Sequence, residues 1–291
     1  MQIKLPLLVG ALLSGTVILA QPAAHTHSGS NSSLRKVNLQ PGQQFKVEHV
    51  MNSNSSMEMM GQAMDVKADA SITSKVEVKA KNAGDYQLTA TVTRMITNAD
   101  MMGQSMNYDS DKPGDNDSEV GKILKDKINQ PLNATLTGDG ILTMQKNENA
   151  GGGAMNPISA MMGGAEDESN GLGDMFLLIP QQGKTGDNWS DSLVAKGAKT
   201  VRNYTIKSMQ GDEAIVLISG TQSVSRTVEN QGMEINVELN NKLSGEATVN
   251  TNTGLIRQRS LTIEGSGTTS VMGQSIPMNT KVTTQSTVSQ L

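Results

Sequence analysis

The sequence contains no cysteine in 291 residues. Disulfides, thiolate metal sites and cysteine nucleophiles are therefore excluded, and the fold must depend on burial and hydrogen bonds. Aromatic residues make up only 2% of the chain. Proteins that stack nucleic-acid bases and barrels that span membranes both need many aromatic side chains, so both classes are disfavoured. The net charge of −4 also has the wrong sign for a nucleic-acid partner.

Residues 1–20 have the pattern of a signal peptide. Lys4 supplies the positive charge, residues 5–19 are mostly apolar, and Ala20 is a small residue before the cleavage point. A transmembrane helix needs a longer apolar run of about 20 residues, so we do not expect a membrane span. We expect a periplasmic or secreted protein after cleavage near Ala20, without a lipid anchor because no cysteine follows.

Residues 21–40 are rich in Ser, Asn, Ala and Gly and show no apolar period. This composition predicts a disordered leader. It contains His25 and His27, which leaves His49 as the histidine expected inside the fold.

A Met-Gly-Gln stretch occurs three times, beginning at Met60, Met102 and Met272, and separates long runs of alternating apolar and polar residues. Glycine between two such runs predicts a hairpin turn. Residues 64–80 alternate almost strictly, which is typical of a strand with one buried face. A strand of that length must twist and bend. We therefore predict a mainly β protein of long antiparallel hairpins in a curved, half-barrel-like sheet, with one or two short helices.

The alternating pattern fills two halves, residues 41–147 and 173–291, separated by a Gly-, Met- and acid-rich segment over 148–172 that we interpret as a flexible linker. The first half also contains apolar residues at helical spacing over 119–129 and a small hairpin over 132–146. The similar patterns suggest a duplication. Whether the halves share one sheet is left open.

The chain resembles a bacterial family of secreted proteins and lipoproteins known as domain of unknown function 6263. The resemblance covers most of residues 41–291, and it implies an exported β-rich protein without a known catalytic site. Besides the Met-Gly-Gln hairpins, it depends on Tyr108-Asp109-Ser110, the helix over 120–128, the strand over 131–137, Gly138-Asp139-Gly140, Pro180 and Gly186-Asp187-Asn188-Trp189-Ser190. Many members of the family carry a lipid anchor, and this chain lacks the cysteine for it.

Methionine is abundant, with 19 residues, and gathers near two of the hairpin turns. Thioethers are soft ligands that suit Cu(I), so one interpretation is a periplasmic copper protein. The alternative is that methionine fills a core that has few aromatic residues. The candidate metal ligands are Met57, Met59, Met60, Met64, Met101, Met102 and Met106.

Three other features of the sequence bear on possible chemistry. His49 lies on the apolar side of its alternating run, where a core histidine is expected rather than a general base. The acidic run from Asp109 to Glu119 departs from a calcium-binding loop because of Pro113 and Val120, so we expect a solvated loop. We expect Trp189 to anchor the start of a strand, with ligand stacking as the alternative.

These observations lead us to expect a non-enzymatic protein of the cell envelope, without a cofactor, whose curved apolar face binds a lipid or another hydrophobic ligand. The expectation depends on a long one-sided apolar face with few bulky residues to fill it. Two alternatives stay open besides copper binding. One is a structural or interaction module with a solid core and an envelope protein as its partner, and the other is an enzyme built around His49.

Overall fold

The computed structural model describes residues 26–28, 33–59, 62–101, 104–145, 172–195, 197–230, 233–271 and 273–291. The expected signal peptide and residues 148–171 of the expected linker lie outside these ranges.

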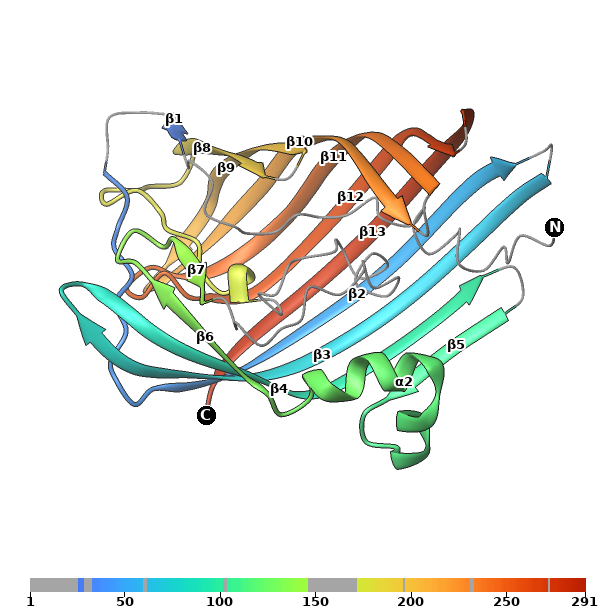
Figure 1. Ribbon diagram of the computed structural model, residues 1–291. Helices are drawn as coiled ribbons and strands as arrows, with labels where there is room; N and C mark the ends of the chain where they lie inside the picture. Colours follow the sequence, from blue (N-terminus) through green and yellow to red (C-terminus); the bar gives the residue numbers. More distant parts are fainter. Residues whose placement is uncertain are drawn as a thin grey trace.

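The described residues form one antiparallel sheet of thirteen strands that curves into an open half-barrel (Figure 1). Twelve strands lie side by side in the order β1-β8-β9-β10-β11-β12-β13-β2-β3-β4-β6-β7, and β5 pairs with β4. The predicted mainly β, curved antiparallel fold is confirmed. The strands are β1 (Thr26–Ser28), β2 (Gln44–Met59), β3 (Gln62–Asn82), β4 (Asp85–Met101), β5 (Gln104–Asp109), β6 (Pro131–Leu136), β7 (Leu142–Met144), β8 (Asn188–Ala195), β9 (Ala198–Gln210), β10 (Glu213–Asn230), β11 (Met233–Asn250), β12 (Ile256–Val271) and β13 (Gln274–Gln290).

The strands on either side of each Met-Gly-Gln stretch pair with each other, as the predicted hairpins require. Strand pairing reaches Met59↔Gln62 and Met101↔Gln104 in the first two hairpins and Val271↔Gln274 in the third. Gly273 has a φ of +80°, a conformation that favours glycine. We call the end of the sheet that these three pairings reach the hairpin end. Gly211 and Gly254 turn the chain at the opposite end. We call that end the cavity end, after the cavity described below.

Alternation along the long strands separates a concave, buried face from an exposed one. In β3, Val66, Ala70 and Val76 are buried while Lys67 and Lys75 are exposed. Burying a side chain of the size of valine or leucine contributes about 1.5–3 kcal/mol, so a shift of register by one residue would be costly. The concave face is therefore set by the sequence pattern itself.

The two halves of the chain share this one sheet. The C-terminal strand β13 pairs with β2 from Gln290↔Phe45 to Met278↔Met57, which joins the strands of residues 173–291 to those of 41–147. The sheet order explains why the sequence alone does not show that the two halves share one sheet. The joint is a pairing between strands far apart in the chain, and it requires no turn signal.

The prediction of a disordered leader over residues 21–40 is wrong for residues 26–28 and 33–40. Thr26–Ser28 forms β1 at the edge of the sheet, and residues 33–40 pack against the cavity end. Val37 and Leu39 are buried, and the backbone N–H groups of Arg35 and Val37 donate to the carbonyl oxygens of Ile179 and Gly138 over 2.8 Å each. Two apolar residues are too few to show a period in the sequence.

Tyr86 in β4 holds this segment, and its removal gives a first prediction. Its buried hydroxyl donates to the Val37 carbonyl oxygen over 2.9 Å and accepts from the Leu39 N–H over 3.2 Å. Tyr86→Phe should lower the free energy of unfolding by about 2 kcal/mol in urea titrations, because it leaves two buried backbone groups unsatisfied. Tyr108→Phe is the control, since its hydroxyl reaches Asn116 over a long 3.3 Å. Equal effects of the two variants would contradict the role of Tyr86.

The helix predicted over 119–129 is shorter than expected. The α-helix α2 (Glu119–Leu124) is preceded by the 3₁₀ helix η1 (Pro113–Asp117) and followed by η2 (Lys125–Lys127), and a further 3₁₀ turn, η3, spans Leu172–Asp174. Ser118 caps α2 by accepting the Gly121 N–H over 2.9 Å. Asn129 has a φ of +60° just beyond η2, and a residue in that conformation cannot continue a helix.

A row of polar side chains crosses the concave face between the two ends. Gln222 in β10 donates to Thr200 in β9 over 3.1 Å and accepts from Asn241 in β11 over 2.8 Å, and Ser55 in β2 donates to Thr280 in β13 over 3.0 Å. All five side chains are buried. This polar row separates an apolar cluster at the hairpin end from the apolar clusters at the cavity end.

Candidate ligand-binding site

Charged side chains at the cavity end occupy positions that the alternation directs to the concave face. Asp191 follows the buried Trp189 by two residues in β8, and Arg202 precedes the buried Tyr204 by two residues in β9. Arg259 has the same relation to Leu261 in β12. Strand pairing places Trp189 opposite Tyr204 and Asp191 opposite Arg202. Three strands thus bring a polar group together on an otherwise apolar surface.

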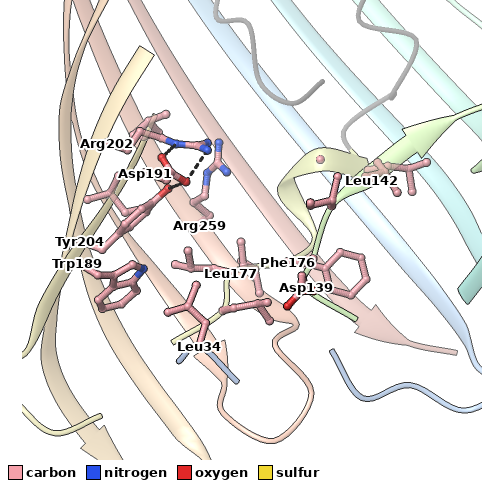
Figure 2. Close-up of a pocket in the computed structure, with 18 residues that line it drawn as sticks. Leu34, Asp139, Leu142, Phe176, Leu177, Trp189, Asp191, Arg202, Tyr204 and Arg259 are labelled. Atoms are coloured by element: carbon pink, nitrogen blue, oxygen red, sulfur yellow. Dashed lines mark hydrogen bonds and ion pairs between the residues drawn. The ribbon is translucent and has the colours of Figure 1, made fainter. Parts of the chain in front are cut away.

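Asp191 is the acceptor at the centre of this group. Arg202 Nε and Nη2 donate to Asp191 Oδ1 and Oδ2 over 2.8 Å each, and Tyr204 Oη donates to Oδ2 over 3.0 Å (Figure 2). The fork of the guanidinium matches the two carboxylate oxygens, which makes this a strong, directional ion pair. The ion pair therefore fixes the position of Asp191 and of the Tyr204 hydroxyl.

The polar group is buried. Asp191 is 9% exposed, Arg259 7% and Tyr204 3%. Burial raises the pKa of the Tyr204 hydroxyl far above its usual value; the charges of Arg202 and Arg259 oppose this shift, and Asp191 adds to it. Tyr204 therefore stays a neutral hydrogen-bond donor throughout the physiological range of pH.

Trp189 and Tyr204 form a rigid aromatic wall beside the ion pair. Their rings stack with centroids 5.2 Å apart and an interplanar angle of 22°, and the Arg202 guanidinium lies 6.0 Å from the centre of the Tyr204 ring. Trp189 lies at the start of β8, as predicted, and it also lines the cavity described next.

A cavity of about 110 Å³ opens beside this polar group (Figure 2). The sheet supplies Ile218, Ile256 and Leu261, the hairpin between β6 and β7 supplies Ile141 and Leu142, and the segments that cross the sheet end supply Leu34, Phe176 and Leu177. Most of the lining is therefore apolar, with Asp191, Arg202, Tyr204 and Arg259 on one wall.

Backbone hydrogen bonds hold the crossing segments over the sheet end. Leu177 N–H donates to the Gly254 carbonyl oxygen over 2.9 Å, and Ile256 N–H donates to that of Met175 over 2.8 Å. Leu34 and Pro180 form a β-bridge, which ties the two segments to each other. The cavity wall is thus built from parts of the chain that lie far apart in the sequence.

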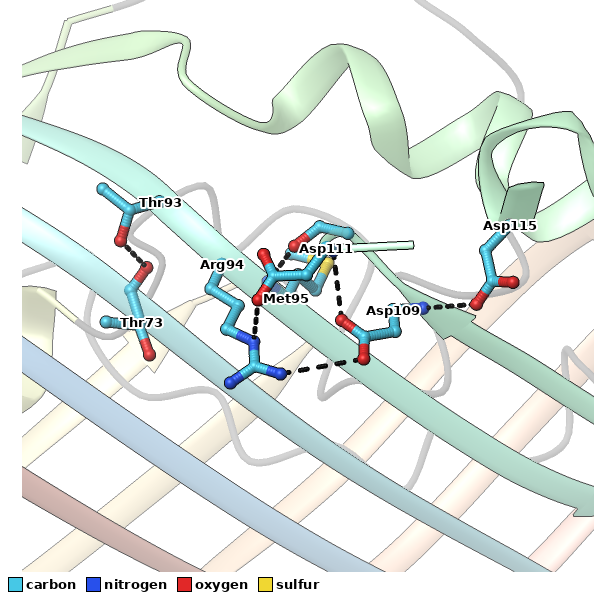
Figure 3. A network of polar contacts seen from close by, with 8 residues as sticks. Thr73, Thr93, Arg94, Met95, Asp109, Asp111 and Asp115 are labelled. Atoms are coloured by element: carbon cyan, nitrogen blue, oxygen red, sulfur yellow. Dashed lines mark hydrogen bonds and ion pairs between the residues drawn. The ribbon is translucent and has the colours of Figure 1, made fainter. Parts of the chain in front are cut away.

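The acidic loop after β5 is ordered by an arginine (Figure 3). Arg94 Nε pairs with Asp111 over 2.8 Å and its Nη2 with Asp109 over 3.7 Å, while the Asp115 carboxylate accepts the Asp109 N–H over 2.9 Å. Within the described ranges, no group of three or more His, Asp or Glu side chains is arranged to hold a metal ion. These carboxylates serve the loop itself.

The candidate methionine ligands are placed as follows. Met57 and Met64 face each other across β2 and β3, are buried, and pack with Ile276 and Met278 in the apolar cluster at the hairpin end, with Met106 partly buried against it. This packing agrees with methionine as a core residue. The side chains of Met59, Met60, Met101 and Met102 lie outside what the structure describes.

His49 is on the concave side of β2, half-buried, with Nδ1 2.9 Å from Ser286 Oγ in β13. The prediction that His49 faces the apolar side of its strand is correct. Its hydrogen-bonding neighbour is a serine of the adjacent strand. His49 does not line the cavity.

Asp191, Arg202, Tyr204 and Arg259 were not predicted as site residues. The signal was present in the sequence, because a charge at an inward position of an alternating strand is unusual. Asp191 lies between Trp189 and Leu193 in such a pattern. The sequence offers no means of knowing that β8, β9 and β12 converge, since that depends on sheet order.

The fold and the cavity define an open, curved antiparallel β-sheet protein with an apolar pocket and one polar wall. The sequence model described as a family of unknown function (DUF6263) matches residues 83–148 and 161–256, more than half of the chain. The protein therefore belongs to this family, and the resemblance inferred from its motifs is confirmed. No curated protein matches the sequence.

The solved structures that resemble the chain weakly include the following three. The structure described as lipid–protein interactions in lipovitellin has 12% identity and a TM-score of 0.48 and matches 87% of this chain, which spans a quarter (25%) of the lipovitellin chain. An outer membrane channel from Pseudomonas putida F1 has 10% identity, 87% and 98% coverage and a TM-score of 0.26. OccK5 (OpdH) from Pseudomonas aeruginosa has 5% identity, 85% and 98% coverage and a TM-score of 0.25. Likenesses at this level do not define a function. In the part of the chain that is described, the helices are too short and too polar to cross a membrane.

Proposed function

We propose that this protein is a non-enzymatic protein of the cell envelope, periplasmic or secreted, that binds a hydrophobic ligand such as a lipid on the concave face of its sheet. The observation that carries the proposal is the apolar cavity at the cavity end, with a few convergent polar groups on one wall. A pocket of that composition is the usual form of a small-molecule site. The N-terminal signal-peptide pattern supports export.

The size of the cavity limits what it holds. A dry cavity of about 150 Å³ takes up benzene. The volume of about 110 Å³ therefore fits one end of a ligand rather than a whole lipid. The rest of such a ligand would extend from the cavity mouth.

The first test is native mass spectrometry of the mature protein purified from periplasm, with metal analysis of the same sample. We expect an added mass of lipid size that organic solvent extracts. A bare polypeptide would contradict the proposal and favour the interaction module. Bound copper would contradict it in favour of the methionine clusters.

A pair of tryptophan variants tests where the ligand binds. Leu177→Trp replaces a leucine side chain that lines the cavity with a bulkier indole ring. Because the ring takes the space of the ligand, the variant should bind the neutral fluorescent probe N-phenyl-1-naphthylamine about tenfold more weakly. Leu217→Trp is the control, since Leu217 is 41% exposed on the convex face. Probe binding is measured by fluorescence titration, with thermal unfolding of both variants. Equal affinity of the two variants would place the ligand elsewhere.

A further inference from the structure

We propose that the cavity takes the apolar end of a single alkyl chain, and that the head group of the ligand stays in water at the cavity mouth. The class of ligand is then a single-chain amphiphile, recognised by its unsubstituted chain end and not by its head group. This inference rests on the proposed function and adds which part of the ligand the cavity recognises.

The cavity is apolar where it is deepest and charged where it meets solvent. Ile218 in β10 and Ile256 and Leu261 in β12 line it and are buried. Asp139, in the turn between β6 and β7, lines it from the other side and pairs with Lys36. The side chains of Lys36 and Asp139 are 61% and 65% exposed, so the cavity opens to solvent on that side. An amphiphile matches this gradient when its chain end lies against the sheet and its head group lies at the mouth.

The polar groups of the buried wall are bonded to one another. Both carboxylate oxygens of Asp191 accept hydrogen bonds from Arg202, and Oδ2 also accepts one from the Tyr204 hydroxyl (Figure 2). Arg259, on the same wall, has an interaction partner as well. A head group that entered the cavity would lose its hydration and would have to displace such bonds. A chain end needs no hydrogen bond and leaves the wall intact.

The volume of the cavity also suits a chain end. A dry cavity of about 150 Å³ takes up benzene, and this cavity is smaller, at about 110 Å³. An alkyl chain is narrower than an aromatic ring, so a linear end fits where a ring does not. The half-buried side chain of Leu177 bounds this space. We therefore expect Leu177 to limit the width of the chain end that the cavity accepts.

The first test compares laurate with dodecanedioate as competitors of N-phenyl-1-naphthylamine at neutral pH, below the concentrations at which micelles form. The diacid has a carboxylate at both ends of the same chain and therefore offers no apolar end. Dodecanedioate should displace the probe at a concentration at least about tenfold higher than laurate, because one carboxylate would have to be buried. A cavity that binds the head group would take both acids equally well.

The head group itself should matter little. Laurate, 1-dodecanol and dodecyltrimethylammonium carry a negative, a neutral and a positive head group on the same chain. The three should displace the probe at concentrations within about threefold of one another, because a head group that stays in water keeps its hydration. A clear preference for one head group would contradict recognition through the chain end.

Trp189 reports the orientation of the bound chain. It is the one tryptophan of the sequence, and it lines the cavity. Bromine quenches tryptophan fluorescence on contact and is close to a methyl group in size. At saturation, 12-bromododecanoate, with bromine at the chain end, should remove most of the Trp189 fluorescence. Its isomer 2-bromododecanoate, with bromine beside the carboxylate, should remove little.

Two leucines provide matched variants. The ring of 12-phenyldodecanoate is too wide for the wild-type cavity, and Leu177→Ala removes a side chain that bounds the space. The variant should therefore bind this acid about tenfold more tightly than the wild type does. Leu217→Ala, on the convex face, should leave the affinity unchanged. Thermal unfolding shows whether each variant is folded.

The outcomes separate this inference from the proposed function. Failure of the probe to bind, or of laurate to displace it, overturns both. Equal displacement by laurate and dodecanedioate, or stronger quenching by 2-bromododecanoate than by its isomer, overturns the chain-end site and leaves the hydrophobic ligand standing. Displacement of the probe without quenching by either bromo acid also overturns the chain-end site. Equal affinity of the Leu177→Ala and Leu217→Ala variants for the phenyl acid overturns the assignment to Leu177.

Discussion

Arg202→Met should lower the free energy of unfolding by about 3 kcal/mol, because removal of one partner leaves the other charge of a buried ion pair without compensation. Arg202 gives Asp191 two hydrogen bonds of 2.8 Å, and the two side chains are 18% and 11% exposed. Of the donors to Asp191 described above, the substitution leaves the Tyr204 hydroxyl in place. The measurement is equilibrium unfolding in urea, followed by circular dichroism.

The control lies in the same strand. Lys207 pairs with Glu246 over 2.7 Å on the exposed face, with the side chains 53% and 44% exposed. An exposed ion pair contributes little, so Lys207→Met should change the free energy of unfolding by no more than about 0.5 kcal/mol. If the two methionine variants lose the same stability, the Arg202–Asp191 pair is not shielded from water.

The double variant separates the cost of an orphaned charge from the worth of the pair. Asp191→Leu together with Arg202→Met removes both charges and replaces them with apolar groups. Such replacements are often neutral, so the double variant should be more stable than Arg202→Met alone. A double variant that is less stable than either single variant would show that the pair itself stabilises the fold. In that case its main role would be structural.

The alternation in the sequence predicted the strands and their faces well. Residues 64–80 were expected to form one strand with a buried side, and β3 extends from Gln62 to Asn82 with that side buried. The Met-Gly-Gln turns were also expected, because glycine and a change of alternating run are local signals. The curved shape followed from strand length. Local patterns were sufficient for all of these features.

Features that depend on distant pairing were missed. The joint between β13 and β2, the edge strand β1 and the packed residues 33–40 leave no local pattern that a single sequence shows. The site belongs to this class. Its charged residues are marked by their inward positions, but Asp191 meets Arg202 only because β8 pairs with β9 in one particular register.

The close packing of the central strands depends on glycine at three positions. Gly220 in β10, Gly245 in β11 and Gly267 in β12 all occupy inward positions. An added Cβ would lie 2.2 Å from the Val201 carbonyl oxygen at Gly220, 2.2 Å from that of Ser260 at Gly245 and 1.9 Å from that of Glu238 at Gly267. The backbone of a neighbouring strand thus occupies the space of a side chain. Glycines in strand interiors mark such close approach and allow a sheet to bend.

Gly267→Ala should therefore lower the free energy of unfolding by about 3 kcal/mol, at the upper end of the cost of overpacking, because the overlapping atom belongs to the backbone and cannot rotate away. Gly114→Ala is the matched control, since a Cβ there would meet no atom of the described residues within 4 Å. Its unfolding free energy should stay within about 0.5 kcal/mol of the wild type. Urea unfolding of both variants measures the difference. If Gly267→Ala were as stable as Gly114→Ala, the strands could separate at that point without cost, and the close packing of the central strands would not depend on glycine.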